Sequence, residues 1–220
     1  MEPTIYFYSD LVANGNQVRN PVSGPVIFLD RDGVINEDSP DYIKNRSEFH
    51  FIPGSLEAIK IFTQKGFTCI VISNQSMIHR KISTMAHLLD MSEMMLAQIN
   101  AFGGQILDIF FCPHAPDENC ICRKPKTGML QKASSLYDID LSKSIMIGDN
   151  LKDIQCANNA GCAQAILVRT GKGSQIEPML KKSPITVDFV GDSLIDVCHW
   201  LTVNVPNVYQ DAINNKGCAC

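Results

Sequence analysis

The sequence predicts an α/β protein in which a parallel β-sheet is covered by helices on both faces. Short apolar runs rich in β-branched and aromatic residues alternate along the chain with amphipathic stretches of helical period. Polar residues follow several of these runs directly, at the positions where strands would end. Alternation of this kind is typical of βαβ units with right-handed crossovers, which bury the sheet between two helical layers.

Six short apolar runs bounded by turn residues are predicted to be strands. They are 26–29 (VIFL), 67–72 (FTCIVI), 106–111 (ILDIFF), 144–147 (SIMI), 164–168 (QAILV) and 185–190 (ITVDFV). Residues 5–8 are a further candidate, for a strand at the edge of the sheet. Ligands of such sheets bind at the carboxyl ends of the strands, so the residues that follow each run are the first candidates for a functional site.

Two helices are predicted from apolar residues that recur at helical spacing. Residues 53–65 place Leu56, Ile59 and Phe62 on one face and stop at a Lys-Gly pair, a plausible C-terminal cap. The second helix, 83–102, has an apolar stripe made of Leu88, Met91, Met95, Ile99 and Phe102. A methionine-bearing stripe could be a soft binding surface, but a helix packed on its sheet is the more common reason for it.

The chain is predicted to hold one domain, because 220 residues fit within a single α/β core. We place this domain at residues 25–203, with an N-terminal extension at 1–24 and a tail at 204–220. The extension could pack over the sheet edge, cover the active site or be disordered. The tail ends in Cys-x-Cys, which lacks the four-residue prenylation pattern, so a frayed end with free thiols is expected.

Composition and charge exclude several classes of partner. The formal net charge is −4, and nucleic-acid binding calls instead for a clustered basic face. The N-terminus lacks a basic segment followed by an apolar stretch, and no apolar run approaches the ~20 residues of a membrane span. We therefore expect a cytoplasmic protein that binds neither nucleic acid nor membrane. A monomer is the expected oligomeric state, although charge and composition do not determine it.

Four consecutive predicted strands end in a polar signature. Asp30 and Asp32 follow the first, and Ser73-Asn74-Gln75 follows the second. Lys124 lies in CRKPKTG after the third strand, and Gly148-Asp149 closes the fourth. An Asp-x-Asp-Gly stretch alone is more often a turn or a helix cap. The recurrence of polar groups at four strand ends favours a functional site instead.

These four signatures, in this order, resemble the phosphatases of the haloacid dehalogenase-like superfamily over residues 26–170. The resemblance implies a Rossmann-like sheet, an essentially capless domain and hydrolysis of a phosphate monoester. It implies that Asp30 attacks phosphorus to form an aspartyl-phosphate, and that Asp32 is the general acid and then the base. Ser73 would bind phosphate oxygens, and Lys124 would supply positive charge and hold the nucleophile.

The resemblance also implies a catalytic Mg²⁺, because two carboxylates that face a phosphate need a divalent cation to offset their charge. Asp30 and Asp149 would bind it through their carboxylates, and Asp32 through its backbone carbonyl. Asp153, four residues after Asp149, leaves two alternatives open. It could support the magnesium from behind the ligands, or it could be a favourable charge in the first turn of a helix.

A second metal site is predicted in the loop FCPHAPDENCICRKP, residues 111–125. Its Cys112, His114, Cys120 and Cys122 form a C-x-H and C-x-C pair, a complete tetrahedral set for structural Zn²⁺. Unrelated core cysteines are the alternative, but a polar loop with prolines is a poor place for buried thiols. The loop continues directly into Lys124, so zinc would fix the backbone that aims this cation.

The DRDGxIN and CPH…CxCRKP motifs resemble two related groups of small phosphatases. These act on D-glycero-D-manno-heptose 1,7-bisphosphate and on histidinol phosphate. Arg80 in SNQSMIHRK, KPKTGML at 124–130 and VRTGKG at 168–173 resemble the heptose group. The five-residue spacer of the zinc loop also occurs in the histidinol group, and Met77 and Lys81 replace two glycines of the heptose motif.

The heptose resemblance implies a small phosphorylated metabolite as substrate and a role in nucleotide-heptose synthesis for the lipopolysaccharide core. The candidate substrate contacts that it implies are Asn36, Asn74, Arg80 and Arg123, together with Lys124. Arg80 and Arg123 would meet the second phosphate of a bisphosphate, although Arg80 could also be an exposed loop residue. The alternatives are a histidinol-phosphate phosphatase and an inactive binding protein on the same scaffold.

Overall fold

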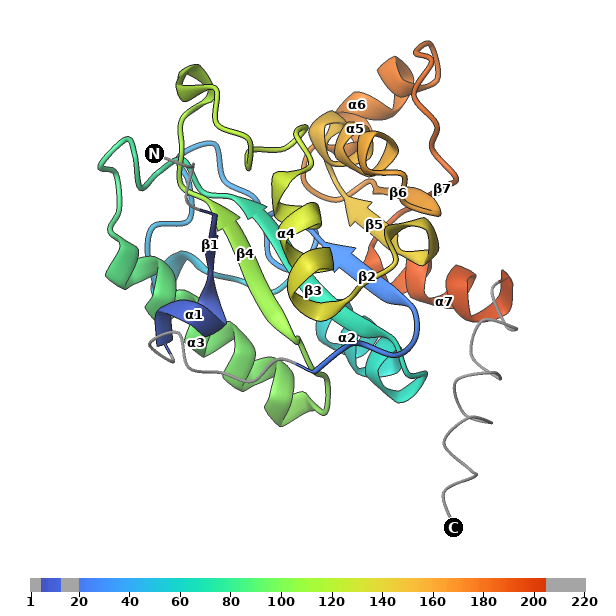
Figure 1. Cartoon of the computed structure of the whole chain (residues 1–220), viewed down its shortest axis with the longest axis horizontal. Coiled ribbons are helices and arrows are strands. Elements are labelled where there is room, and N and C mark those ends of the chain that lie inside the picture. Colours follow the sequence, from blue (N-terminus) through green and yellow to red (C-terminus); the bar gives the residue numbers. More distant parts are fainter. Residues whose placement is uncertain (1–4, 13–19, 205–220) are drawn as a thin grey trace.

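The computed structural model describes residues 5–12 and 20–204, and the terminal Cys-x-Cys lies outside these residues. Their centre is a seven-stranded sheet in the order β1-β4-β3-β2-β5-β6-β7, in which only β1 runs antiparallel to its neighbour (Figure 1). The strands are β1 Tyr6–Phe7, β2 Val26–Leu29, β3 Thr68–Asn74, β4 Asp108–Cys112, β5 Ile145–Gly148, β6 Gln164–Val168 and β7 Phe189–Gly191.

Helices connect the strands and cover both faces of the sheet. They are α1 Tyr8–Val12, α2 Ser55–Gln64, α3 Met85–Phe102, α4 Gly128–Tyr137, α5 Leu151–Ala160, α6 Gly173–Leu180 and α7 Leu194–Asn204. Short 3₁₀ turns lie at Arg46–Glu48, Pro116–Glu118 and Leu141–Lys143. In the described chain, no helix is both long and apolar enough to cross a membrane.

Two apolar cores, one on each face, follow from the alternation of side chains along the strands. Ile27 and Leu29 of β2 contact the core that α2, α3 and α7 complete. Val26 and Phe28 of the same strand contact the opposite core, to which α4, α5 and α6 contribute. β2 is thus buried on both faces, as its uninterrupted apolar sequence predicts. The expected parallel sheet between two helical layers is confirmed.

Local sequence signals explain where the two expected helices begin and end. Gly66, with φ of +82°, follows α2 at the position where a left-handed residue ends helices. Thr84 caps α3, and its hydroxyl accepts a hydrogen bond from the His87 backbone. Met91 and Met95, the methionines of the predicted stripe, are buried in the core on this face of the sheet, which supports packing over a binding surface. Phe102, at the end of the stripe, is exposed.

The last predicted strand differs from the structure, which starts β7 at Phe189 and not at residue 185. Asp188 explains the late start. Its backbone N–H donates to the Ala165 carbonyl, and its carboxylate accepts from the Ala165 N–H. Asp188 alone thus binds both the backbone N–H and the backbone carbonyl of Ala165. Thr186, two residues earlier, is bound instead to the side chain of Asn158.

The start of the chain forms the sheet edge. β1 pairs with β4, and Ser9 of α1 donates to both carboxylate oxygens of Asp108, at 3.0 and 2.6 Å. Tyr137 of α4 donates to the same buried carboxylate. Residues 5–12 therefore pack over the edge, one of the three alternatives for the N-terminal extension. The division of the chain at residues 24 and 203 remains a proposal.

Candidate active site

The carboxyl ends of β2, β3 and β5 open into one polar cavity of about 260 Å³. β2 lies between β3 and β5, so the crossovers leave it on opposite sides and create a crevice at its end. The residues that line the cavity are Asp30, Asp32, Asp38, Ser39, Pro40, Tyr42, Ile43, Ser73, Asn74, Gln75, Ser76, Arg123, Lys124, Asp149, Asn150, Lys152, Asp153 and Lys172. Seven of the nine predicted residues of the catalytic and substrate sets, counting Asp149, therefore meet here; Asn36 and Arg80 do not line it.

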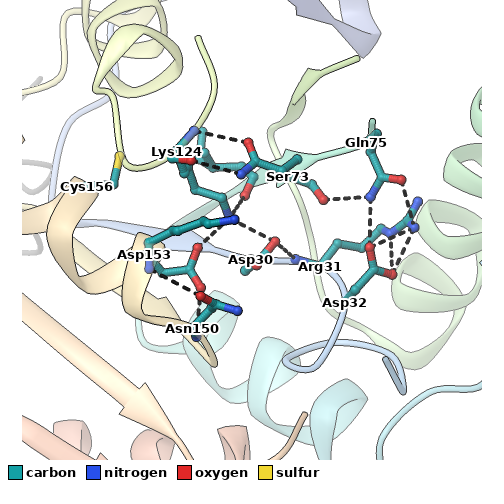
Figure 2. Close-up of polar contacts among 12 residues, drawn as sticks. Asp30, Arg31, Asp32, Ser73, Gln75, Lys124, Asn150, Asp153 and Cys156 are labelled. Atoms are coloured by element: carbon teal, nitrogen blue, oxygen red, sulfur yellow. Dashed lines mark hydrogen bonds and ion pairs between the residues drawn. The ribbon is translucent and has the colours of Figure 1, made fainter. Parts of the chain in front are cut away.

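Lys124 joins two carboxylates at the centre of the cavity. Its buried ammonium lies 3.0 Å from Asp30 Oδ1 and 2.7 Å from Asp153 Oδ1, and it donates to the Ile72 carbonyl at 2.7 Å (Figure 2). All three of its N–H donors are thus used. Burial alone would lower the pKa of Lys124, but Asp153 and Asp30 outweigh this effect and raise it. Lys124 is held positive beside the expected nucleophile.

Asp30, the expected nucleophile, is held through one of its carboxylate oxygens. The Arg31 backbone N–H and the Lys124 ammonium both contact its Oδ1. The described residues give its Oδ2 no donor, so this oxygen is available to a substrate or a metal. Burial raises the pKa of Asp30 to about 7; the charge of Lys124 opposes this rise, and Asp153 adds to it.

Asp149 lies at the end of β5 and is held by the loop after β6. Its Oδ2 accepts from the Lys172 backbone N–H at 2.7 Å. Burial raises the pKa of Asp149 to about 8, and the charges of Asp153 and Asp30 raise it further. The ligand atoms of Asp30, Asp149 and Asp153 lie within 4.8 Å of one another. Hard oxygen ligands with repelling charges fit a divalent cation such as Mg²⁺.

Asp153 combines both of the alternatives left open by the sequence. Its Oδ2 accepts from the Asn150 backbone N–H at 3.0 Å and completes a capping box at the start of α5. Its other oxygen pairs with Lys124. Asp153 therefore caps a helix and at the same time fixes the cation that contacts Asp30 (Figure 2).

Asp32 is held by three side chains, two of which, Arg31 and Gln75, are not among the predicted site residues. The guanidinium of Arg31 donates to both of its oxygens at 2.9–3.0 Å, and Gln75 Nε2 donates to Oδ2 at 2.8 Å. Asn36 donates to Oδ1 at 2.9 Å. Burial by itself would raise the pKa of Asp32, but the Arg31 charge and these hydrogen bonds lower it overall. Arg31 and Gln75 directly follow Asp30 and Asn74 in the quoted motifs, which was the only signal for them.

Ser73 and Asn74 are neighbours at the end of β3 but make different contacts. Ser73 Oγ accepts from Gln75 Nε2 at 2.8 Å, which leaves its hydroxyl proton free to point at a ligand. Asn74 bonds the backbone of Lys124 twice, through Oδ1 at 3.1 Å and Nδ2 at 3.2 Å. Asn74 therefore positions Lys124, and Asn36 positions Asp32.

The two arginines that resemble substrate contacts lie in different places. Arg123 lines the cavity, and its Nη1 donates to the His114 carbonyl at 3.1 Å, so the Cys/His loop anchors it. Arg80 is exposed and is not among the cavity-lining residues. Lys152 and Lys172, which the sequence did not single out, are the further cations of the cavity.

The Cys/His loop brings its four side chains together after β4. The three thiols lie 3.2–3.5 Å apart in pairs, and His114 Nδ1 lies 3.5 Å from Cys112 and 3.2 Å from Cys122. A tetrahedron of sulfur ligands at about 2.3 Å from a metal has edges of about 3.8 Å. The cluster therefore fits a single tetrahedral metal ion with little movement.

Comparison with known proteins places this site in a family. A family model for HAD-hydrolase-like proteins matches residues 121–197. Over 152 residues the chain is 44% identical to the D-glycero-β-D-manno-heptose-1,7-bisphosphate 7-phosphatase of Pseudomonas aeruginosa, a match that covers 69% of this chain and 85% of that protein. The chain belongs to this phosphatase family. The Bordetella bronchiseptica phosphatase of the same name is 43% identical over 148 residues, 67% of this chain and 82% of that one.

A solved structure of the family shares the fold of this chain. The D,D-heptose 1,7-bisphosphate phosphatase from B. bronchiseptica, complexed with magnesium and phosphate, matches with a TM-score of 0.76 and 37% identity. The match covers 81% of this chain and 98% of that one. The chain is thus a haloacid dehalogenase-like phosphatase that hydrolyses phosphate monoesters.

Proposed function

We propose that this phosphatase removes the 7-phosphate of D-glycero-D-manno-heptose 1,7-bisphosphate through an aspartyl-phosphate at Asp30. The observation that carries the proposal is the identity of 41–44% with relatives that all have this activity in their names. The cavity supports it, because it joins a nucleophile, a buried cation and a carboxylate cluster suited to a metal.

In the first half-reaction, Asp30 Oδ2 forms a bond to phosphorus while the bond between phosphorus and the sugar oxygen breaks. Asp32 donates a proton to the departing alkoxide. The lowered pKa of Asp32 means that it must acquire this proton as the negative phosphate approaches, since a nearby anion raises the pKa of a carboxyl group. Lys124 offsets the charge of the transferring phosphoryl group.

In the second half-reaction, Asp32 accepts a proton from water, whose oxygen forms a bond to phosphorus as the bond to Asp30 breaks. Arg31 favours this step, because it keeps Asp32 ionised between the two half-reactions. Bound Mg²⁺ would neutralise charge between carboxylates and phosphate oxygens. Asp30, Asp149 and the Asp32 carbonyl would hold it, and Lys124 keeps Asp153 in place behind them.

Zinc is the metal that best suits the Cys/His loop, with Cys112, His114, Cys120 and Cys122 as a closed set of ligands. Because Arg123 and Lys124 follow the last of these cysteines, a bound ion would fix the segment that carries both cations. The zinc would be structural and would take no part in the chemistry. We further propose that the enzyme acts as a monomer in the cytoplasm, in nucleotide-heptose synthesis for the lipopolysaccharide core.

Histidinol phosphate is the second candidate substrate, and two residues of the cavity favour it. An amino alcohol calls for an acidic or aromatic group near the leaving group, and Asp38 and Tyr42 both line the cavity. Asp38 is already paired with Lys172 at 2.9 Å, however, which weakens its attraction for an amine. Arg123 and Lys152 at the same cavity favour an anion over an amine.

Phosphate release tests the proposal. Purified protein with Mg²⁺ is assayed on D-glycero-D-manno-heptose 1,7-bisphosphate and on histidinol phosphate, with Asp30→Asn protein as the blank. We expect kcat/KM for the heptose ester to exceed that for histidinol phosphate by at least about a hundredfold, and the blank to be silent. A preference for histidinol phosphate would refute the substrate assignment. No release from either ester would favour a different phosphate ester or an inactive binding protein.

A further inference from the structure

We propose that Lys152, together with Arg123, binds the second phosphate of the substrate and so makes the enzyme prefer a bisphosphate. The inference deepens the proposed function and rests on it. It assigns to Lys152 the role that the sequence suggested for the exposed Arg80. Both Lys152 and Arg123 line the catalytic cavity.

Of the four cations that line the cavity, Lys124 and Lys172 are paired with carboxylates of the described residues, whereas Arg123 and Lys152 are not. Lys124 is used by Asp30 and Asp153, and Lys172 is paired with Asp38 at 2.9 Å. Within residues 5–12 and 20–204, neither Arg123 nor Lys152 has a carboxylate within ion-pair distance. Their charge is therefore available to a ligand.

Lys152 lies at a position where a positive charge is unfavourable unless an anion binds beside it. It lies in the first turn of α5, at the end of a helix that favours negative groups. The positive charge of Arg123 lies close enough to repel it. A residue that breaks local electrostatic rules in this way is expected at a functional site. A phosphate dianion between the two cations would remove their repulsion.

The two cations approach the cavity from different elements, which gives the second phosphate a defined place. Arg123 comes from the Cys/His loop and is fixed by its hydrogen bond to the His114 carbonyl. Lys152 comes from α5, whose start is capped by Asn150 and Asp153 beside the reacting carboxylates. A substrate with one phosphate at Asp30 would place its other phosphate between the loop and the helix. A single phosphate could not use both sites.

The test compares two substrates and three variants of the magnesium-loaded enzyme. The substrates are the heptose 1,7-bisphosphate and the heptose 7-phosphate, which lacks only the second phosphate. Lys152→Met removes the charge, Lys152→Arg keeps it, and Lys143→Met removes an exposed lysine paired with Asp140 far from the cavity. Because Lys152 is exposed, its replacement should not disturb folding, which thermal unfolding checks.

For Lys152→Met we expect kcat/KM for the bisphosphate to fall about tenfold to a hundredfold, with less than about a threefold change for the 7-phosphate. Lys152→Arg and Lys143→Met should retain the wild-type preference. The 1-phosphate product, which keeps the second phosphate, should also inhibit Lys152→Met more weakly than wild type.

Two results would overturn the assignment of Lys152. One is a wild-type enzyme that hydrolyses both esters equally well, and the other is a Lys152→Met variant that keeps the full preference for the bisphosphate. Failure of the wild type to hydrolyse either heptose ester would instead contradict the proposed function, and the assignment of Lys152 would fall with it.

Discussion

Arg31 contacts both aspartates that flank it in the DxD motif. Its backbone N–H donates to Asp30, while its buried guanidinium donates hydrogen bonds to both carboxylate oxygens of Asp32. A bidentate pair of this kind fixes the direction of a carboxylate as well as its charge. The DxD spacing alone predicts two acids on the same side of a strand end. It does not reveal that the residue between them turns back to hold the second acid.

Gly33 and Gly66 share a backbone conformation, but only Gly33 packs against a side chain of the active site. Both have nearly the same left-handed conformation, with φ of +83° and +82°. A Cβ on Gly33 would collide with the carboxylate of Asp149, whereas a Cβ on Gly66 would meet nothing within 4 Å. Alanine at either position should therefore cost about 1–2 kcal/mol of stability from backbone strain.

Only Gly33→Ala should also damage catalysis, because it displaces Asp149. We expect its kcat/KM to fall about a hundredfold and its requirement for Mg²⁺ to rise, while Gly66→Ala stays near wild type in both. Urea unfolding and magnesium-dependent phosphate release check the two parts. Equal activity in the two variants would show that Asp149 does not need its present position.

At the scale of elements, the loop between β4 and α4 joins the Cys/His cluster, which could hold a metal ion, to the polar cavity. Cys112 ends β4, and Lys124 lies two residues after Cys122. Arg123 donates to the backbone of His114, and Asn74 of β3 bonds the Lys124 backbone twice. The position of the catalytic ammonium thus depends on the loop as well as on β3.

Cys120→Ser should release the metal of this loop and reduce kcat about tenfold to a hundredfold, because Lys124 loses its support. Cys162→Ser, at a partly buried cysteine outside the cluster, is the matched control and should keep both metal and activity. Elemental analysis of the purified proteins should find about one zinc per chain in wild type and control, and none in Cys120→Ser. Full zinc content in Cys120→Ser would refute the ligand set.

The sequence predicts the elements better than the contacts between them. Apolar runs and helical spacing locate β2, α2 and α3 to within a few residues, because these patterns depend on burial along one element. The polar strand ends predict that Asp30, Ser73, Lys124 and Asp149 meet, since parallel strands share one carboxyl edge. Other features depend on how separate segments meet, and no local sequence pattern predicts them. They are the exposure of Arg80, the proposed role of Lys152 and the late start of β7.

For the molecule as a whole, the carboxylate cluster links stability to pH and magnesium. Without metal, the pKa of Asp30 is raised to about 7 and that of Asp149 to about 8, both mainly by burial. In the unfolded chain both ionise near pH 4. Between these values the folded state therefore binds more protons than the unfolded chain. The stability that these two groups contribute is fully present below about pH 4 and is lost as the pH rises through about 7–8.

Magnesium should offset this loss, since a cation stabilises the ionised carboxylates. We expect the rise in Tm on addition of Mg²⁺ to be larger at about pH 8.5 than at about pH 5.5. Asp149→Asn, which removes one of the buried charges, should reduce this difference. Thermal unfolding of metal-stripped protein with and without Mg²⁺ gives the answer. An equal rise at both pH values would mean that these carboxylates do not bind the ion.

Hydrolysis through an aspartyl-phosphate requires Asp30 to be the residue that receives the phosphoryl group. The most direct measurement is acid quenching of the enzyme during turnover of the heptose bisphosphate, followed by mass spectrometry of its peptides. We predict one added phosphoryl group on the peptide that contains Asp30, and none in Asp30→Asn, which should not turn over. A phosphoryl group on another residue, or turnover by Asp30→Asn without any phosphorylated peptide, would contradict the account.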